Sequence, residues 1–159
     1  MKWSLVEPLE SESLIDEFEQ LCGYKFPESF RECVIKNNGG RPEKRVFDIE
    51  TEEELLLNTL LSFNKKIECL TIWETLEACK IHLSDAKMNE DIEWIKECET
   101  ILERYVLFAD TPFGDKIAFD KTDDSVVYIC HDGVAGFEKI ADSFEEFLDC
   151  LYEDEDDDI

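Results

Sequence analysis

Basic residues are scarce in this sequence. Its 159 residues include 16 Lys and Arg against 41 Asp and Glu, and its formal net charge is -25 at pH 7. Nucleic acid and anionic membranes repel such a chain, so we expect neither as a partner. A charge of this sign attracts basic proteins or cations and raises the rate of encounter with them. Plain solubility is the alternative explanation of the acidity.

Long apolar runs and closely spaced cysteine pairs are missing too. No run approaches the roughly 20 apolar residues of a membrane span, and the apolar stretch within residues 1–7 is too short for a signal peptide. The seven cysteines are odd in number, scattered and without a Cys-x-x-Cys pair. This pattern is typical of reduced, mostly buried thiols. We therefore expect a cytoplasmic protein.

Common active-site motifs are absent as well. The sequence has no Gly-x-Ser-x-Gly elbow, glycine-rich phosphate loop or His-Glu-x-x-His helix, although missing motifs alone do not exclude catalysis. Cys79-x-x-His82 has the spacing of half a metal site without a second half, and His131 directly follows Cys130. We expect no metal, no cofactor and no enzymatic activity.

Aspartates cluster around two predicted turns, which invites an acid–base or calcium interpretation. Asp is common in turns because its side chain bonds nearby backbone groups. The spacing of a calcium loop, with its sixth-position glycine, is also missing. A structural role is therefore favoured for all five: Asp110, Asp115, Asp120, Asp123 and Asp124.

Residues 106–151 carry the clearest secondary-structure pattern. Short apolar stretches separated by turn residues predict antiparallel strands at 106–109, 116–119 and 126–130. Ser143 followed three residues later by Glu146 is typical of a helix N-terminus. The helix that follows presents one apolar face, which we expect to pack on the sheet: Phe144, Phe147, Leu148 and Leu151.

Helices are also predicted before these strands. Residues 13–22 are amphipathic and Gly23 is placed to end that helix. Pro27 opens a second helix, which residues 37–40 end because they tolerate left-handed backbone angles. Apolar residues then recur at helical spacing in two further stretches, with a polar break at 84–87 between them: 72–83 and 92–102.

The predicted fold class is α+β, with an antiparallel sheet of about four to six strands and with N-terminal helices and a C-terminal helix packed around it. Residues 45–49 suit an edge strand, whereas residues 52–61 fit helix or strand equally. We expect one domain, residues 1–152, followed by an acidic disordered tail, residues 153–159.

Several short motifs follow one another along the chain. They are Phe26-Pro-Glu-Ser-Phe30, Asn38-Gly-Gly40, Phe108-Ala109, Phe113-Gly-Asp115, Phe119-Asp120, Val127-Tyr128 and Ile140-Ala-Asp-Ser-Phe-Glu-Glu-Phe-Leu148. In this order they resemble the SUKH superfamily, the domains similar to the yeast cell-wall-assembly regulator, over residues 13–151. Residues 41–104 match least. The resemblance implies structural roles for Pro27, Asn38, Gly39, Gly40, Gly114, Asp115, Phe119, Asp120, Tyr128, Ser143, Phe144, Phe147 and Leu148.

For bacterial members, this resemblance implies immunity proteins that bind and neutralise a cognate toxin, often a nuclease. Eukaryotic members look like regulatory interaction domains. We therefore predict that the chain neutralises a toxin with a basic surface by stoichiometric occlusion. Two other hypotheses stay open: a regulatory protein–protein interaction module, and a small-ligand-binding protein or enzyme that uses the turn carboxylates. The sequence indicates no oligomeric state.

Candidate contact residues come from two residue classes. A large aromatic side chain at the centre of an interface often carries much of the binding energy, although core packing is the commoner fate of a helical Trp. Acidic side chains suit a basic cleft, although a solvated face is the simpler explanation. The predicted partner-binding residues are Trp73, Trp94, Glu50, Glu52, Glu53, Glu54, Asp123 and Asp124.

Overall fold

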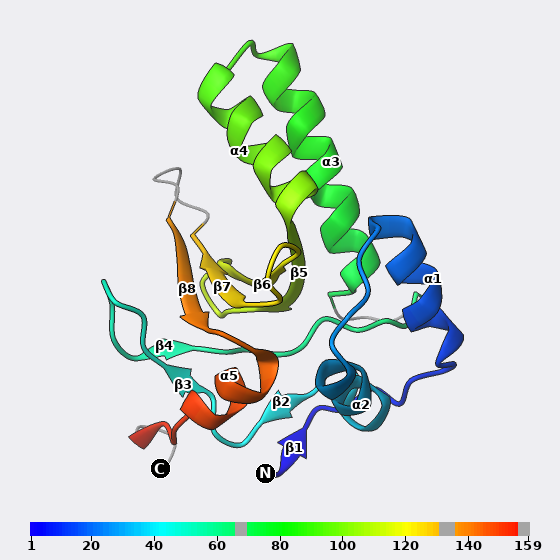
Figure 1. The fold of residues 1–159 in the computed structure, drawn as a ribbon, viewed down its shortest axis with the longest axis vertical. Coiled ribbons are helices and arrows are strands. Elements are labelled where there is room, and N and C mark those ends of the chain that lie inside the picture. Colours follow the sequence, from blue (N-terminus) through cyan, green and yellow to red (C-terminus); the bar gives the residue numbers. More distant parts are fainter. Residues whose placement is uncertain (66–69, 131–135, 156–159) are drawn as a thin grey trace.

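The computed structural model describes residues 1–65, 70–130 and 136–155 and shows the predicted α+β fold (Figure 1). At its centre, four antiparallel strands neighbour one another in chain order. They are β5 (Tyr105–Asp110), β6 (Lys116–Asp120), β7 (Val126–Ile129) and β8 (Phe137–Ala141). The helices are α1 (Ser13–Cys22), α2 (Glu28–Asn37), α3 (Ile72–Met88), α4 (Ile92–Arg104) and α5 (Phe144–Cys150).

The central sheet is apolar on both faces. Successive side chains of a strand point to opposite faces, so each strand contributes to two layers. One face belongs to the main core and includes Phe108, Ile117, Phe119, Val126 and Tyr128. The other face forms a smaller cluster of Tyr105, Ala118, Val127 and Ile129, against which Ile101 of α4 packs. The strands β5, β6 and β7 confirm the sequence prediction, whereas β8 was not predicted.

Phe30 of α2 lies at the centre of the main core. Aromatic rings from α2, α5 and the sheet pack together here, which buries large apolar surfaces and holds both helices on one face of the sheet. Five rings lie with their centroids 4.9 to 6.4 Å from that of Phe30: Phe26, Phe63, Phe108, Phe119 and Phe144.

The predicted start of α5 is confirmed. The Ser143 Oγ accepts a 3.1 Å hydrogen bond from the Glu146 backbone N–H, and a Glu146 carboxylate oxygen accepts one of 3.0 Å from the Asp142 N–H. Each side chain therefore satisfies a donor at the helix N-terminus. Phe144 and Phe147 are buried, as the apolar pattern predicts.

The prediction of a break at residues 84–87 is wrong. The helix α3 continues to Met88, and the chain turns only at Asn89 and Glu90, where Glu90 adopts φ of 53°. The residues of the proposed break are polar because most of them face solvent, while Ala86 is fully buried. The helices α3 and α4 form an antiparallel hairpin that projects from the sheet in Figure 1.

Two short strand pairs complete the fold. They are β1 (Trp3–Ser4) with β2 (Arg41–Pro42), and β3 (Val46–Phe47) with β4 (Leu55–Leu56). Residues 52–61 therefore contain a two-residue strand, and Leu60 adds an isolated bridge to Ala109. The edge strand predicted within residues 45–49 is confirmed as β3, although Val46 also forms an isolated bridge to Tyr152 on its other side.

The thiols are less buried than the sequence predicted. Among the described cysteines only Cys98 is buried, while Cys150 is exposed and the others are half-buried: Cys22, Cys33, Cys79 and Cys130. All six are free. Cys69 lies outside the described residues. None of the helices in the described ranges is long and apolar enough to cross a membrane.

Candidate partner-binding surface

The loop between β3 and β4 presents the acidic residues that the sequence singled out. Glu50, Glu52, Glu53 and Glu54 are all exposed. The carboxylate of Asp48 accepts a 2.9 Å hydrogen bond from the Glu54 backbone N–H, and the pKa of Asp48 is lowered first by this bond. The loop therefore closes on one of its own carboxylates.

The C-terminal segment lies against the same loop. The backbone groups of Val46 and Tyr152 exchange two hydrogen bonds, of 3.0 and 2.9 Å. The Tyr152 hydroxyl donates a third, of 2.7 Å, to Asp48 Oδ1. A guanidinium nitrogen of Arg45 lies 3.8 Å from an oxygen of Asp154. Of the proposed tail, residues 156–159 lie outside the described residues, and the start of the tail is held at β3.

These contacts join two acidic segments that lie about a hundred residues apart along the chain. We name the result the acidic surface: Asp48, Glu50, Glu52, Glu53, Glu54, Glu153 and Glu155, all exposed. Its field acts on Tyr152, whose pKa is raised to about 12 by the hydrogen bond to Asp48, by burial and by the charges of Asp48, Glu54 and Glu53.

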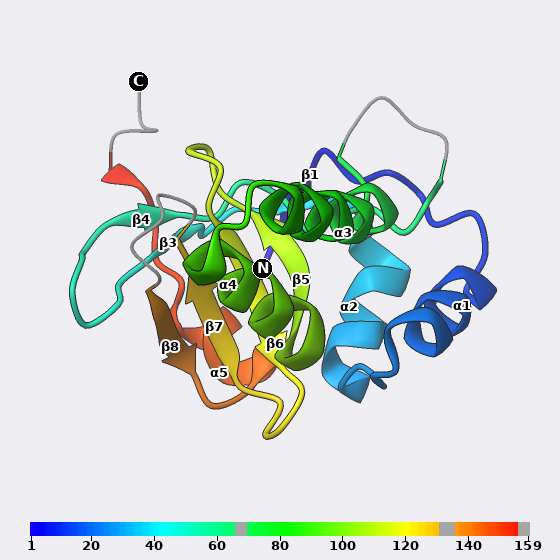
Figure 2. The same ribbon diagram turned by 90° about the horizontal axis from the view of Figure 1, so that it is seen from above.

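The structure does not bring Asp123 and Asp124 to the acidic surface. Asp123 accepts hydrogen bonds from the N–H and hydroxyl of Ser125, of 3.0 and 2.6 Å. Asp124 accepts a 2.7 Å hydrogen bond from the hydroxyl of Tyr24. Figure 2 shows the β6–β7 turn and the β3–β4 loop on different sides of the molecule. Both aspartates act in holding this turn.

The other turn aspartates also have structural partners. Asp120 is buried and accepts hydrogen bonds from Arg104 and Thr122. Asp115 accepts a hydrogen bond from the Tyr128 hydroxyl. Asp110 accepts hydrogen bonds from Asn58 and Thr59. Within the described ranges, no group of three or more His, Cys, Asp or Glu side chains is arranged to hold a metal ion.

The two predicted tryptophan anchors have different environments. The Trp73 Nε1 donates a 2.7 Å hydrogen bond to the Phe63 carbonyl, and its ring meets Phe18 edge-on at 5.2 Å between centroids. Trp73 is therefore mainly a core residue. Trp94 is half-buried, lies 6.2 Å from the His82 ring and lines an open pocket.

This pocket, which we name the hairpin pocket, lies between the α3–α4 hairpin and the sheet and has a volume of about 600 Å³. The helices contribute Ala78, Trp94 and Ile101, and the sheet contributes Leu107 and Ile129. Sequence reasoning found Trp94 but not the pocket, because its walls come from elements distant in the chain.

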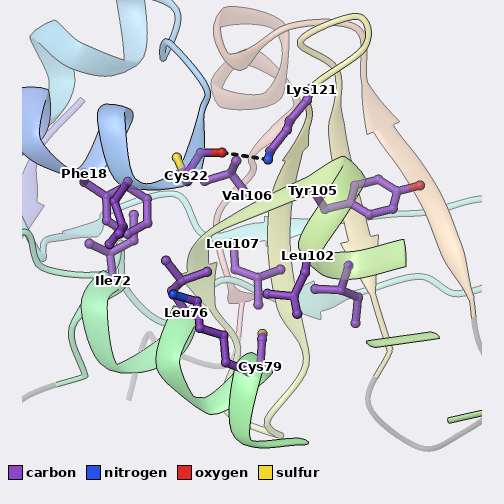
Figure 3. A pocket seen from close by; sticks show the side chains of 13 residues that line it. Phe18, Cys22, Ile72, Leu76, Cys79, Leu102, Tyr105, Val106, Leu107 and Lys121 are labelled. Carbon is purple, nitrogen blue, oxygen red and sulfur yellow. Dashed lines mark hydrogen bonds between the residues drawn. The ribbon is translucent and has the colours of Figure 1, made fainter. Parts of the chain in front are cut away.

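A smaller cavity of about 230 Å³ lies between α1, α3 and the start of β5 (Figure 3). Apolar side chains such as Phe18, Ile72 and Leu76 line it. At its edge, the Lys121 Nζ donates a 2.8 Å hydrogen bond to the Cys22 carbonyl at the end of α1. Because the Lys121 amine already binds the last turn of α1, we interpret the cavity as a packing gap between α1 and its neighbours.

Residues 12–148 match the family model described as SMI1-KNR4 cell-wall, SUKH_6. The chain belongs to this SMI1-KNR4 family. No curated protein matches it. The SUKH resemblance seen in the sequence motifs is thereby confirmed, and family membership is consistent with a protein-interaction role.

Residues 38–40, one of the motifs, hold the N-terminal segment on the core. The buried Asn38 donates to the Glu7 carbonyl and the Ser62 hydroxyl and accepts from the Phe63 N–H, at 2.9, 3.0 and 2.9 Å. Only Gly39 adopts the left-handed conformation expected for this stretch, with φ of 67°, whereas Asn38 has φ of -51°. The role of Asn38 is therefore to form a polar cross-link, and not to adopt a left-handed backbone conformation.

Proposed function

We propose that this protein binds and neutralises a protein toxin with a basic surface, by covering that surface in a stoichiometric complex. The acidic surface is the observation that carries this proposal. It presents seven exposed carboxylates from two segments that are held together by the contacts of Tyr152 with Val46 and Asp48. Membership of the SMI1-KNR4 family supports a role in protein interaction.

A nuclease is the favoured class of toxin on physical grounds. An enzyme that binds nucleic acid carries Lys and Arg positioned on phosphates, and a row of carboxylates can take the place of those phosphates. The formal charge of -25 adds long-range attraction, which speeds encounter and weakens as salt rises.

The anchoring of the acidic surface favours tight binding. The loop closes on Asp48 through the Glu54 N–H, and Tyr152 fixes the C-terminal segment to the same carboxylate. A surface that is ordered before binding loses less conformational entropy when the complex forms. Binding without turnover is sufficient for this function, and the turn aspartates serve the fold through their bonds to Arg104, Tyr128 and Tyr24.

The test is co-expression with the protein encoded by the neighbouring gene, followed by calorimetry of the purified pair. We expect restored growth, a one-to-one complex, and affinity that falls with rising salt. The variant Glu50→Lys/Glu52→Lys/Glu53→Lys reverses three charges of the acidic surface and should weaken binding by about a hundredfold, as loss of several close charge pairs does.

A matched variant reverses three exposed acidic residues outside the acidic surface: Glu32→Lys/Glu103→Lys/Asp149→Lys. It changes the net charge equally and should retain binding within about tenfold, because only the long-range attraction is reduced. Continued toxicity in the presence of abundant folded protein, or an equal loss in the two variants, contradicts the proposal.

A further inference from the structure

The hairpin pocket is a mainly apolar space that the described residues leave open, on a protein with a formal net charge of -25. Its floor is the second face of the sheet, where Leu107 and Ile129 lie, and α4 covers this face at Ile101. We infer that the hairpin pocket receives one apolar side chain of the protein partner, flanked in that partner by basic residues. This inference rests on the proposed function and adds a second contact with the same protein partner, in addition to the acidic surface.

The helical spacing of the lining residues places them on one face of each helix. Trp94, Cys98 and Ile101 of α4 follow one another at spacings of four and three residues, so they share one face of the helix. On α3, residues with the same kind of spacing face the pocket: Thr75, Ala78, Cys79 and His82. Burial raises the pKa of the Cys79 thiol to about 11, so this thiol carries no charge at pH 7.

The hairpin pocket is large enough to admit an anchor side chain together with part of the partner's chain beside it. Its volume of about 600 Å³ lies within the range of protein pockets that bury a ligand of drug size, roughly 300 to 1,000 Å³. A large apolar side chain that enters such a pocket at an interface often becomes a dominant contact, because it is fully desolvated there.

Charge at the rim selects the kind of partner. Glu74 and Glu97 line the hairpin pocket, and Lys116 is the one Lys or Arg among its described lining residues. Acidic residues also outnumber basic ones along α3 and α4. An apolar anchor beside Lys or Arg is therefore complementary to the site, whereas an anionic lipid or an acidic peptide is repelled.

Exposed apolar residues occur at the hairpin pocket and beside one of its lining residues. Leu70 lines it and is 37% exposed, and Phe113, next to the lining residue Gly114, is 75% exposed. Ile81, Met88 and Ile92 of the hairpin are also exposed, but they do not line the hairpin pocket. Exposed apolar side chains at a pocket, such as Leu70, are typical of interaction surfaces in soluble proteins.

The experiment uses synthetic peptides as probes, so that it does not depend on an identified toxin. One peptide carries a central Phe between lysines, a second carries the same Phe between glutamates, and a third carries Ser between lysines. Binding to the full chain is followed by tryptophan fluorescence and calorimetry. We expect the Phe–Lys peptide to bind about tenfold more tightly than either of the other two.

A filled pocket provides the matched control. Ala78→Phe places a ring in the hairpin pocket and should weaken binding of the Phe–Lys peptide by about tenfold. Ser84→Phe adds the same ring to an exposed position of the same helix and should leave binding within about twofold. Circular dichroism of both variants checks the fold. A second pair of variants tests the charge at the rim. Glu97→Lys removes a carboxylate that lines the hairpin pocket and should weaken binding of the Phe–Lys peptide, whereas Glu103→Lys, at an exposed position outside the pocket, should not.

Equal binding of the Phe–Lys peptide by Ala78→Phe and Ser84→Phe overturns the inference, as does equal binding of the lysine and glutamate peptides. Dimerisation of the free protein that Ala78→Phe abolishes assigns the hairpin pocket to a second copy and also overturns it. If Ala78→Phe neutralises the toxin normally while the reversed acidic surface does not, the inference fails and the proposed function stands. The opposite result is also possible to distinguish. If the protein neutralises no toxin but Ala78→Phe still weakens peptide binding, the proposed function is contradicted and the hairpin pocket is supported as a binding site.

Discussion

The Tyr152 hydroxyl donates a 2.7 Å hydrogen bond to Oδ1 of Asp48 and so connects residues 104 positions apart in the chain. The bond lowers the pKa of Asp48, after the larger effect of the Glu54 N–H, and raises the pKa of Tyr152 to about 12. Because this contact brings the C-terminal carboxylates to the β3–β4 loop, the acidic surface depends on it.

Alkaline titration should report this bond. A folded-state pKa above the ordinary value of 10.0 means that the contribution of Tyr152 to stability is complete below pH 10 and is lost as the pH rises to about 12. We expect ultraviolet titration of the folded protein to show less tyrosinate at pH 10 than the urea-unfolded chain. Tyr152→Phe should remove the step near pH 12, and an unchanged step would contradict the assignment.

Acid stability should depend on Asp120. Burial alone would raise the pKa of this carboxyl, but hydrogen bonds from Arg104 and Thr122 outweigh that effect, and the pKa is lowered. Its stabilisation is therefore present above the ordinary value of 3.8 and is lost as the pH falls through the folded-state pKa.

Asp120→Asn should lower the free energy of unfolding at pH 7 by about 1–3 kcal/mol and flatten its dependence on pH in acid, as measured by urea denaturation. Asp123→Asn, at an exposed position of the same turn, is the control and should lower the free energy of unfolding by less. A larger loss in the control would contradict a central role for the Arg104–Asp120 pair.

The glycines at two helix ends should differ in their tolerance of alanine. A Cβ at Gly40 would lie 2.8 Å from the Asn37 carbonyl oxygen, whereas one at Gly23 meets nothing within 4 Å but sits at φ of 69°. We expect Gly40→Ala to lower the free energy of unfolding by about 3 kcal/mol and Gly23→Ala to lower it by about 1 kcal/mol, as measured by urea denaturation. The reverse order would show that the close approach at Gly40 relaxes easily.

The two helical tryptophans should separate stability from binding. Trp73→Phe removes the donor to the Phe63 carbonyl and should cost about 1–3 kcal/mol of unfolding free energy. Trp94→Ala should reduce binding of the Phe–Lys peptide while costing less stability, because Trp94 is half-buried at the hairpin pocket. Comparable losses of stability in both variants would make Trp94 a core residue.

Local chemistry in the sequence accounts for most of the elements. Ser143 with Glu146 identifies the start of α5, and Gly23 with φ of 69° identifies the end of α1, because capping uses residues next to one another in the chain. The break at 84–87 was predicted wrongly because an exposed helix face is polar too. Ala86, fully buried among these residues, keeps the helical period.

The candidate site could be predicted only in part. The exposed loop residues Glu50 to Glu54 are visible as a charge run, but pairing of Val46 with Tyr152 is a long-range contact without a local pattern. Asp123 and Asp124 were predicted both as turn residues and as contact residues, and their bonds to Ser125 and Tyr24 agree with the turn role. The hairpin pocket is invisible in sequence because α3, α4 and three strands build it together.

The helix α4 ends at Arg104 and β5 begins at Tyr105, with no linker between them. Arg104 is tied to Asp120 of the neighbouring strand by two hydrogen bonds. The base of the hairpin is thereby clamped, whereas its tip around Asn89 projects away from the sheet (Figure 1). We therefore expect changes of length or sequence at that tip to alter the surface of the hairpin while leaving the sheet beneath it intact.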